Sequence, residues 1–205
     1  MSFEQAAALP QAGLLALQGL EFGGEIKQGQ QVLINGAGRG VGTLALQYAV
    51  SCGAIVDCVD LPEKFSLLQG LGANHCIDYT KEDYTDTGKQ YDLILDVIAH
   101  RTISDYRRAL KAGGTFSMVG GSMGGLLLKL MLFGRMISRF AGKKIGIMGY
   151  RPSRNDLNRL SQMFEDKKLV PVIDKTYPLA ESPEAFRYFG CGNVKGKIII
   201  SVNTN

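Results

Sequence analysis

Four glycines occupy alternate positions in the stretch "GAGRGVG", at Gly36, Gly38, Gly40 and Gly42. An apolar run comes directly before them, and a stretch with helical spacing follows from 41 to 52. Because glycine has no Cβ, such a loop can turn tightly and bring main-chain N–H groups close to phosphate oxygens. The unpaired amides and the positive dipole end of the following helix favour the same anion.

The glycine loop therefore predicts a pyrophosphate site. Gly40, Val41 and Gly42 are the residues expected in direct contact, and Gly36, Gly38 and Arg39 complete the loop. The alternative is that the glycines only let the strand and the helix pack closely. The position of the loop, directly after a strand and directly before a helix, favours the anion site.

Asp60 ends the second expected strand, 18 residues after Gly42 (60 − 42 = 18). In nucleotide-binding folds an acidic residue there accepts hydrogen bonds from the adenosine ribose, and its charge repels a 2′-phosphate. Leu61 and Pro62 have no side-chain donor, so a 2′-phosphate would depend on Lys64 alone. The sequence thus favours NAD(H) over NADP(H), although Asp60 could also be a surface residue that ends a strand.

Residues at the ends of three further strands are expected to face the same ligand. Ligands of open parallel sheets lie outside the carboxyl ends of the strands. Tyr79 is expected to cover the adenine or the ribose, with an ordinary surface tyrosine as the alternative. The nicotinamide half of the groove should be lined by Asp96, Val97, Ile98, Val119, Gly120 and Gly121. Gly120 and Gly121 could instead form a plain turn.

Strands and helices alternate along most of the chain. Strands are expected at 31–36, 55–60, 75–79, 91–98, 115–121 and 143–150, and helices between them at 41–52, 62–71 and 103–111. Such an order predicts an α/β fold of the Rossmann type, a doubly wound parallel six-stranded sheet with helices on both faces. We divide the chain into a leading helix (1–22), a nucleotide-binding domain (23–168) and a C-terminal segment (169–205). A helix is expected over 3–19 and an amphipathic one over 151–169.

Composition narrows the classes of partner. The chain has 205 residues and a formal net charge of +4, spread without a concentrated basic block, so we expect no nucleic acid partner. The four cysteines lack the spacing of a zinc site, and we expect reduced thiols in a cytoplasmic protein. The apolar segment 124–140 contains three basic residues before it reaches the ~20 residues of a membrane span. A covering helix or lid is expected there.

Several segments in order resemble one known family: "AAALPQAGLLALQGL", "GQQVLINGAGRGVGTLALQYAVSCGA", "LGANHCIDYTKED", "YDLILDVI", "ALKAGGTFSMVGG" and "LVPVIDKTYPLAESPEAFRYFGCGNVKGKIIISV". Together they resemble the cofactor-binding half of the medium-chain dehydrogenase/reductase superfamily, in particular its zinc-independent quinone oxidoreductase-like branch. No cysteine stands near Pro10, where the resemblance would place a zinc ligand. No zinc is therefore expected.

The resemblance implies hydride transfer between a nicotinamide cofactor and a quinone, enone or carbonyl substrate. It also implies an N-terminal GroES-like catalytic domain that this chain lacks, toward which the last segments would return. Most substrate contacts would belong to that domain, so no catalytic acid or base is assigned.

Two main hypotheses stay open: an oxidoreductase, and a truncated dinucleotide-binding module without turnover by itself. A methyltransferase is a third, disfavoured because Asn35 stands where an acidic residue is usual. A homodimer through the edge strand at 144–150 and a separately supplied N-terminal catalytic domain are the expected protein partners.

Overall fold

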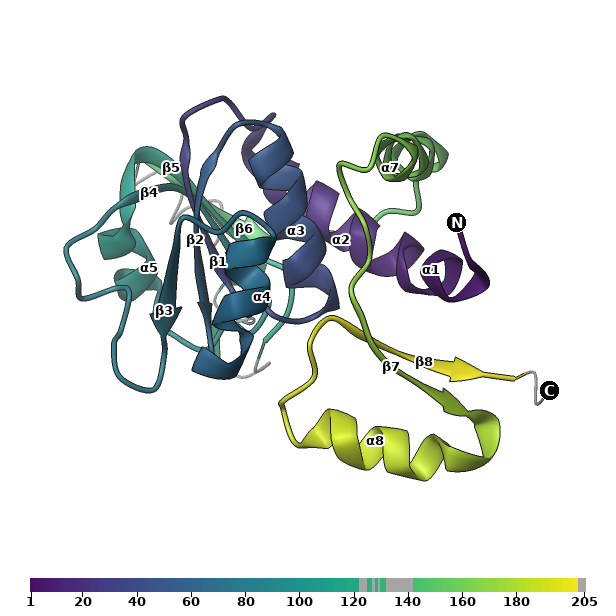
Figure 1. The fold of residues 1–205 in the computed structure, drawn as a ribbon. Coiled ribbons are helices and arrows are strands. Elements are labelled where there is room, and N and C mark those ends of the chain that lie inside the picture. The colour runs from purple at the N-terminus through teal and green to yellow at the C-terminus, as the bar shows by residue number, and fades with distance from the viewer. Residues whose placement is uncertain (122–124, 127, 129, 132–141, 203–205) are drawn as a thin grey trace.

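A parallel six-stranded sheet forms the centre of the computed structural model, which describes residues 1–121, 125–126, 128, 130–131 and 142–202. The strand order is β3-β2-β1-β4-β5-β6 (Figure 1). The strands are β1 (Gln31–Asn35), β2 (Ile55–Asp60), β3 (His75–Asp78), β4 (Tyr91–Asp96), β5 (Leu110–Met118) and β6 (Lys144–Ile147). Every neighbouring pair is parallel, so the predicted doubly wound α/β fold is confirmed.

Helices cover both faces of this sheet, which explains why its strands are runs of apolar residues rather than alternating ones. Val32, Leu33 and Ile34 of β1 are all fully buried. On one face α2 (Pro10–Leu20), α3 (Gly40–Ser51) and α4 (Phe65–Gly70) enclose a core that includes Leu17, Leu44 and Leu68. On the other face α5 (Ile103–Ala109) contributes Tyr106.

Several element boundaries differ from the sequence-based expectation, and two of the differences have a clear physical reason. The single helix expected over 3–19 is two helices, α1 (Phe3–Ala8) and α2, because Pro10 lacks an N–H and occupies the first turn of a new helix. The helix expected over 103–111 ends at Ala109, and β5 begins at Leu110, five residues earlier than predicted (115 − 110 = 5). Leu110 is fully buried opposite Tyr91, and Gly113, with φ of 74°, lies beside the irregularity in this pairing.

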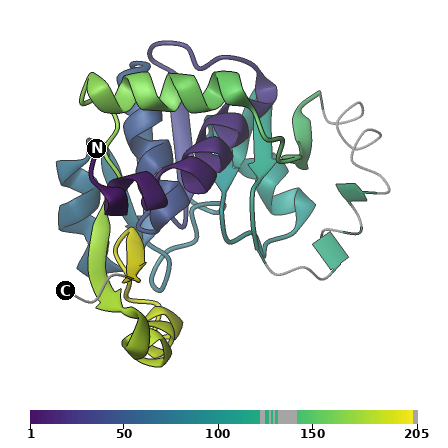
Figure 2. The ribbon, with the colours of Figure 1, turned by 90° about the vertical axis from the view of Figure 1, so that its right-hand side faces the viewer.

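The C-terminal part contains α7 (Arg154–Glu165), β7 (Ile173–Pro178), α8 (Ser182–Gly190) and β8 (Lys197–Ser201). β7 and β8 form a separate two-stranded parallel sheet, which lies beside α1 and carries α8 on its other side (Figures 1 and 2). The segment quoted from 169 onward in the sequence analysis thus contains two strands and one helix. The lid expected over 124–140 lies mostly outside the described residues.

Short 3-10 helices complete the described elements, at η1 (Glu21–Gly23), η2 (Pro62–Lys64) and η3 (Leu179–Glu181). Within the described ranges, no helix is long and apolar enough to cross a membrane.

α7 packs across α2, as Figure 2 shows, and one leucine fixes the contact. Leu160 is 1% exposed, and its Cδ1 would lie 2.8 Å from a Cβ added at Gly13. Close approach of the two helices therefore needs both the glycine and the leucine. Arg159 adds a bidentate ion pair to Glu21, with N–O distances of 3.1 and 2.7 Å.

We predict that Leu160→Ala lowers the free energy of unfolding by about 2–5 kcal/mol, because it leaves a cavity between α7 and α2. Leu157→Ala is the matched control, since Leu157 lies on the same helix and is 39% exposed. We expect the control to change stability by less than about 0.5 kcal/mol. Urea denaturation of both variants is the measurement, and equal losses would contradict this packing.

Candidate nucleotide-binding site

The glycine loop connects β1 to α3 at the place where the strand order reverses. β1 lies between β2 and β4, and the chain leaves β1 toward β2 and returns later to β4. Ligands of open α/β sheets bind at such a switch point, outside the carboxyl ends of the strands. The loop thus lies where the sequence predicted it.

The first and last glycines of the loop touch each other. Gly36 has φ of 80°, a left-handed conformation that favours glycine, and its N–H donates to the Val59 carbonyl at 3.0 Å. A Cβ at Gly42 would lie 2.4 Å from the Gly36 carbonyl oxygen and 2.5 Å from Cα of Ala37. The backbone of α3 therefore approaches the end of β1 so closely that only glycine fits at position 42.

The N-terminus of α3 has no side chain that caps it. Arg39 is the N-cap residue and makes no side-chain hydrogen bond to the first turn. Among the residues that the structure describes, no side chain accepts a hydrogen bond from the amides of Gly40, Val41 and Gly42. The helix dipole adds partial positive charge at the same place.

A lysine from the far end of the chain lies against this helix terminus. The Cε of Lys197 would lie 2.4 Å from a Cβ added at Gly40, so the lysine stem crosses the loop at its third glycine. The backbone fixes this arrangement, because the Gly196 N–H donates to the Gly38 carbonyl at 2.8 Å. Burial lowers the pKa of Lys197 below its ordinary value. No acidic side chain of the described residues forms an ion pair with Lys197.

The positive end of α3 and the Lys197 side chain thus meet at the third glycine of the loop, and no carboxylate of the described residues forms an ion pair with Lys197. Such an arrangement suits a bound phosphate or carboxylate. Sequence reasoning missed Lys197 because it lies 157 positions after Gly40 (197 − 40 = 157). The available signal was weak: a lysine between a glycine and the apolar run "III".

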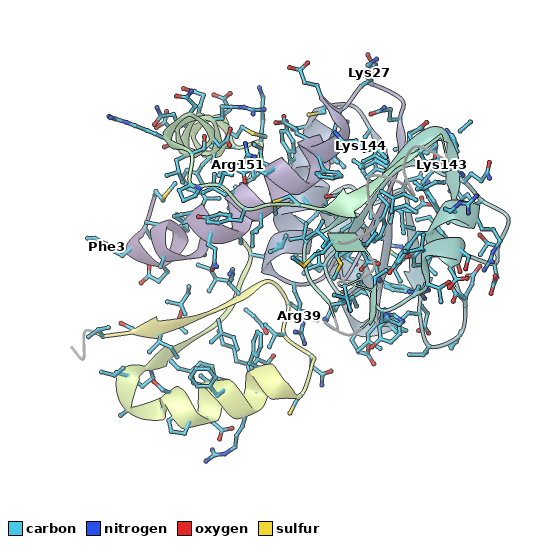
Figure 3. The ribbon with its side chains drawn as sticks, turned by 180° about the vertical axis from the view of Figure 1, so that it is seen from behind. Phe3, Lys27, Arg39, Lys143, Lys144 and Arg151 are labelled. Carbon is cyan, nitrogen blue, oxygen red and sulfur yellow. The ribbon has the colours of Figure 1, made fainter. Side chains whose placement is uncertain are left out.

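Arg39 does not turn toward the amides of the loop. Its guanidinium carbon lies 5.1 Å from the centre of the Phe189 ring, so the side chain is directed toward α8. Figure 3 shows Arg39 at the junction between the main sheet and the C-terminal sheet. This position gives Arg39 a contact with the C-terminal segment that the sequence did not predict.

Asp60, at the end of β2, lies directly beside the glycine loop. Its Oδ2 accepts a hydrogen bond from the Gly38 N–H at 2.7 Å, and its Oδ1 accepts one from the Leu61 N–H at 2.9 Å. The Lys64 ammonium lies 3.0 Å from Oδ1, and the Asp60 and Lys64 side chains are 7% and 3% exposed. The structure thus brings together the two residues that the sequence assigned to the ribose and to a 2′-phosphate.

Asp96, at the end of β4, is completely buried and holds the loop ends together. Its carboxylate accepts hydrogen bonds from Asn35 at 2.8 Å, from the Tyr106 hydroxyl at 2.9 Å and from the Ile98 N–H at 3.1 Å. Burial raises the pKa of Asp96 above its ordinary value. The side chain therefore positions the surrounding backbone and does not itself line an open groove.

The remaining predicted residues gather at the same edge of the sheet. Ile98 is 37% exposed and its Cγ1 would lie 3.3 Å from a Cβ at Gly36, while Val97 and Val119 are half-buried. The loops after β4 and β5 pack tightly, since a Cβ at Gly120 would lie 2.5 Å from the Val97 carbonyl oxygen. Gly121 pairs with Ala99, and Tyr79 stands at the surface with 44% exposure.

Comparison with known proteins identifies the family. Residues 71–200 match the model of a family described as zinc-binding dehydrogenase. The chain belongs to the medium-chain dehydrogenase/reductase superfamily. The resemblance seen in the sequence is thereby confirmed at the level of the superfamily.

Similar proteins extend this match over the glycine loop. The chain is 31% identical to 2-methylene-furan-3-one reductase of Solanum lycopersicum, over 98% of its own length and 47% of that protein. It is 29% identical to a mitochondrial NAD(P)H oxidoreductase of Bos taurus, over 98% of its length and 56% of that protein. The structure of a quinone oxidoreductase from Coxiella burnetii is 28% identical, with a TM-score of 0.85, and the match covers 99% of this chain and 62% of that one.

This dehydrogenase homologue spans about half the length of the curated relatives described above. The description of the matched family mentions zinc. Among the residues that the structure describes, no three His, Cys, Asp or Glu side chains are grouped so that they could hold a metal ion. The absence of zinc stays a prediction.

For this dehydrogenase homologue, we predict that Gly42→Ala lowers the free energy of unfolding by about 2 kcal/mol or more, because the added methyl group meets rigid backbone. Gly70→Ala is the matched control: it also lies in a helix, and a Cβ there would meet nothing within 4 Å. We expect the control to be neutral or to stabilise by up to ~1 kcal/mol. Chemical denaturation compares the two, and an unaffected Gly42→Ala variant would refute the close approach.

Proposed function

We propose that this chain binds a nicotinamide dinucleotide at the carboxyl edge of its sheet and belongs to an oxidoreductase that transfers hydride. The observation that supports this most directly is the convergence of Lys197 and the uncapped N-terminus of α3 on the glycine loop. Both favour a pyrophosphate, whose two negative charges would pair with the Lys197 ammonium and with the partial positive charge of the helix end. The NAD(P)H dependence stated in the name of the bovine relative points the same way.

Each residue at the edge has a proposed part in binding. The amides of Gly40, Val41 and Gly42, together with the Lys197 ammonium, hold the pyrophosphate. Asp60 accepts a hydrogen bond from the adenosine ribose, with Tyr79 close to the adenine. The backbone after β4 and β5, which Asp96 positions, supports the nicotinamide and excludes water from one of its faces. The bound nicotinamide itself supplies or accepts the hydride.

The substrate we propose is a quinone, an enone or a related carbonyl compound. The reductase from Solanum lycopersicum and the quinone oxidoreductase from Coxiella burnetii support this class by their names. Hydride addition to such a conjugated system needs positioning and stabilisation of the developing oxyanion. We assign no residue of this chain to that last task.

A dinucleotide-binding module that has no turnover by itself is the alternative. Exposed apolar side chains of the C-terminal part favour this alternative. On α8, Phe186 is 74% and Phe189 48% exposed, and they line a groove together with Ile198 and Ile200 of β8. A separately supplied GroES-like catalytic domain would cover such a surface. We propose that residues 169–205 meet this domain. We also propose that residues 1–22, which contain α1 and α2, lead into a nucleotide-binding domain at 23–168.

Three further expectations belong to this proposal. NAD(H) is favoured over NADP(H) because Asp60 carries a negative charge. No zinc takes part. We also propose a cytoplasmic, reducing location, in which the four thiols stay free; the bovine relative is described as mitochondrial.

We predict that the chain binds NADH and that Lys197→Gln weakens this binding about tenfold or more, since an ammonium beside a phosphate is lost. Lys175→Gln, on the neighbouring strand β7, removes the same charge and should leave affinity within about twofold. Protein-enhanced NADH fluorescence or calorimetry measures both. A folded wild-type chain that shows no association at millimolar NADH would overturn the proposal.

The same titration should depend on pH. Deprotonation of Lys197, whose pKa burial lowers, removes a positive charge from the loop, so NADH affinity should fall as the solution becomes alkaline. Lys197→Gln should abolish most of that fall, because its side chain does not titrate. A wild-type and a variant curve that run in parallel would argue against a phosphate contact of Lys197.

Oxidation of NADH by a panel of quinones and enones separates the enzyme from the module. We expect binding of NADH in either case. Turnover by this chain supports the enzyme, whereas binding without oxidation of NADH favours the module and calls for a test with a GroES-like catalytic domain added.

We also propose a homodimer through the outermost strand of the main sheet, β6, in the segment 144–150. β6 ends the strand order, and Figure 3 shows Lys143 and Lys144 at this end of the sheet. The outermost strands of sheets are common sites of self-association. Light scattering should give twice the chain mass of 22.2 kDa, and a monomeric mass at micromolar concentration would contradict the dimer.

A further inference from the structure

Two cysteines stand directly opposite each other in the main sheet, and the proposed nucleotide site uses neither of them. Cys58 of β2 is the register partner of Cys76 of β3, and the two strands run parallel. Side chains of register partners project to the same face of a sheet, so both thiols point toward the helices on that face. Both pack with Leu68 of α4 in one apolar core. The fold thus brings together two thiols that lie 18 positions apart in the sequence (76 − 58 = 18).

The separation of such a pair suits a disulfide. Neighbouring strands lie about 4.7–4.9 Å apart, and the Cα atoms of linked cysteines usually lie about 4.4–6.8 Å apart. The Cβ atoms of linked cysteines lie closer, at about 3.5–4.5 Å, so a link requires a small local shift of one strand. β3 is the outermost strand of the main sheet and has only four residues, so it can make this shift more readily than a central strand.

The two thiols differ in their access to solvent. Cys76 is partly exposed, whereas Cys58 is 0% exposed. A small oxidant can therefore reach the Cys76 sulfur from solvent, while the Cys58 sulfur is enclosed by the protein around it. This asymmetry gives the pair two separate parts, because Cys76 can react first and Cys58 lies beside it as the second thiol.

The surroundings of the pair make its first reaction slow. Burial raises the pKa of both thiols above the ordinary value, and the nearby carboxylates of Asp57 and Asp60 raise it further. Each of these carboxylates pairs with a lysine, and α4, which packs against β3, has no charged side chain. Because the thiolate is the reactive form, we expect Cys76 to need a sustained oxidant or alkaline solution. The second reaction is intramolecular, so the close placement of Cys58 accelerates it.

We propose that Cys58 and Cys76 form a reversible disulfide when the protein meets a peroxide. The Cys76 thiolate attacks one peroxide oxygen, the O–O bond breaks, and the hydroxide that leaves takes up a proton to become water. Cys76 is then a sulfenic acid. The Cys58 sulfur attacks the Cys76 sulfur, so that an S–S bond forms, the S–O bond breaks, and a second water leaves with the Cys58 proton. In total the two thiols lose two electrons and two protons, and one hydrogen peroxide is reduced to two waters.

This modification does not depend on dinucleotide binding, and it agrees with a reducing location. Disulfides of cytosolic proteins are usually transient and redox-sensing, so the thiols would be linked only under oxidation. The link would lie two positions before Asp60 and Asp78, which are the last register partners of β2 and β3. Oxidation would therefore hold together the strand ends beside the glycine loop, and reduction would release them.

Peptide mass spectrometry without reduction tests the proposal on the folded wild-type chain, after treatment with hydrogen peroxide in mildly alkaline solution. Unfolding in excess iodoacetamide blocks the remaining thiols before they can exchange. We expect the Cys58 and Cys76 peptides to be joined to each other, and dithiothreitol to separate them again. A non-reducing gel should show no chains that are joined through these two cysteines.

A variant without the other two cysteines isolates the pair. In Cys52→Ala with Cys191→Ala, Cys58 and Cys76 are the only thiols (4 − 2 = 2), and peroxide should remove both in a way that dithiothreitol reverses. Adding Cys58→Ala leaves Cys76 without its partner. The sulfenic acid at Cys76 should then persist and be captured by dimedone.

Three results would overturn the proposal. The first is a peroxide-treated chain in which the Cys58 and Cys76 peptides stay separate. The second is oxidation of Cys76 to a sulfinic acid while Cys58 stays reduced, and the third is a link from either residue to Cys52 or Cys191 instead. If a variant does not fold, the peptide map of the wild type decides by itself.

Discussion

The close approach of α3 to the end of β1 is the constraint on which the site depends. Gly42 packs against the carbonyl of Gly36 so closely that a Cβ there would lie 2.4 Å from the oxygen, well inside van der Waals contact distance. This contact fixes the helix axis so that its first amides point past the end of the strand. Because Arg39 supplies no capping side chain, the same geometry leaves those amides without a side-chain acceptor from the described part of the chain. A tight structural contact and an open anion site thus come from one arrangement.

Two buried carboxylates extend this arrangement along the edge of the sheet. Asp60 ties β2 to the glycine loop through the Gly38 amide, and Asp96 ties β4 to β1 through Asn35. Each carboxylate is surrounded by donors, which is the condition under which a buried acidic group is tolerated. Asp96 differs from Asp60 because no cation forms an ion pair with it among the described residues, and burial raises its pKa. Asp96 positions the backbone around it, whereas Asp60 lies beside the expected position of the ribose.

Local sequence predicted the sheet and the glycine loop well, because their determinants are short-range. The apolar run of β1 and the spacing of the glycines before α3 are patterns that span only a few residues. The order of strands and helices follows from such local patterns. The contacts that complete the site are not of this kind. Lys197 reaches Gly40 only because the C-terminal strand returns to the loop, and Arg39 turns to Phe189 for the same reason. No local pattern encodes such a return, and the burial of Lys64 likewise depends on how η2 folds against Gly38.

The C-terminal sheet is too small to be stable by itself and needs contacts with the rest of the chain. Two parallel strands with one helix bury little apolar surface, and a sheet of this kind normally has both faces covered. Here α1 lies against one side and α8 against the other, while the Gly196 amide and Lys197 attach β8 to the glycine loop. Phe186 and Phe189 nevertheless remain well exposed on α8. Because Arg39 and Lys197 join this sheet directly to the loop, anything that covers the exposed phenylalanines also bears on the orientation of the proposed phosphate ligands. Nucleotide binding and the covering of the C-terminal sheet should therefore be thermodynamically linked, each favouring the other.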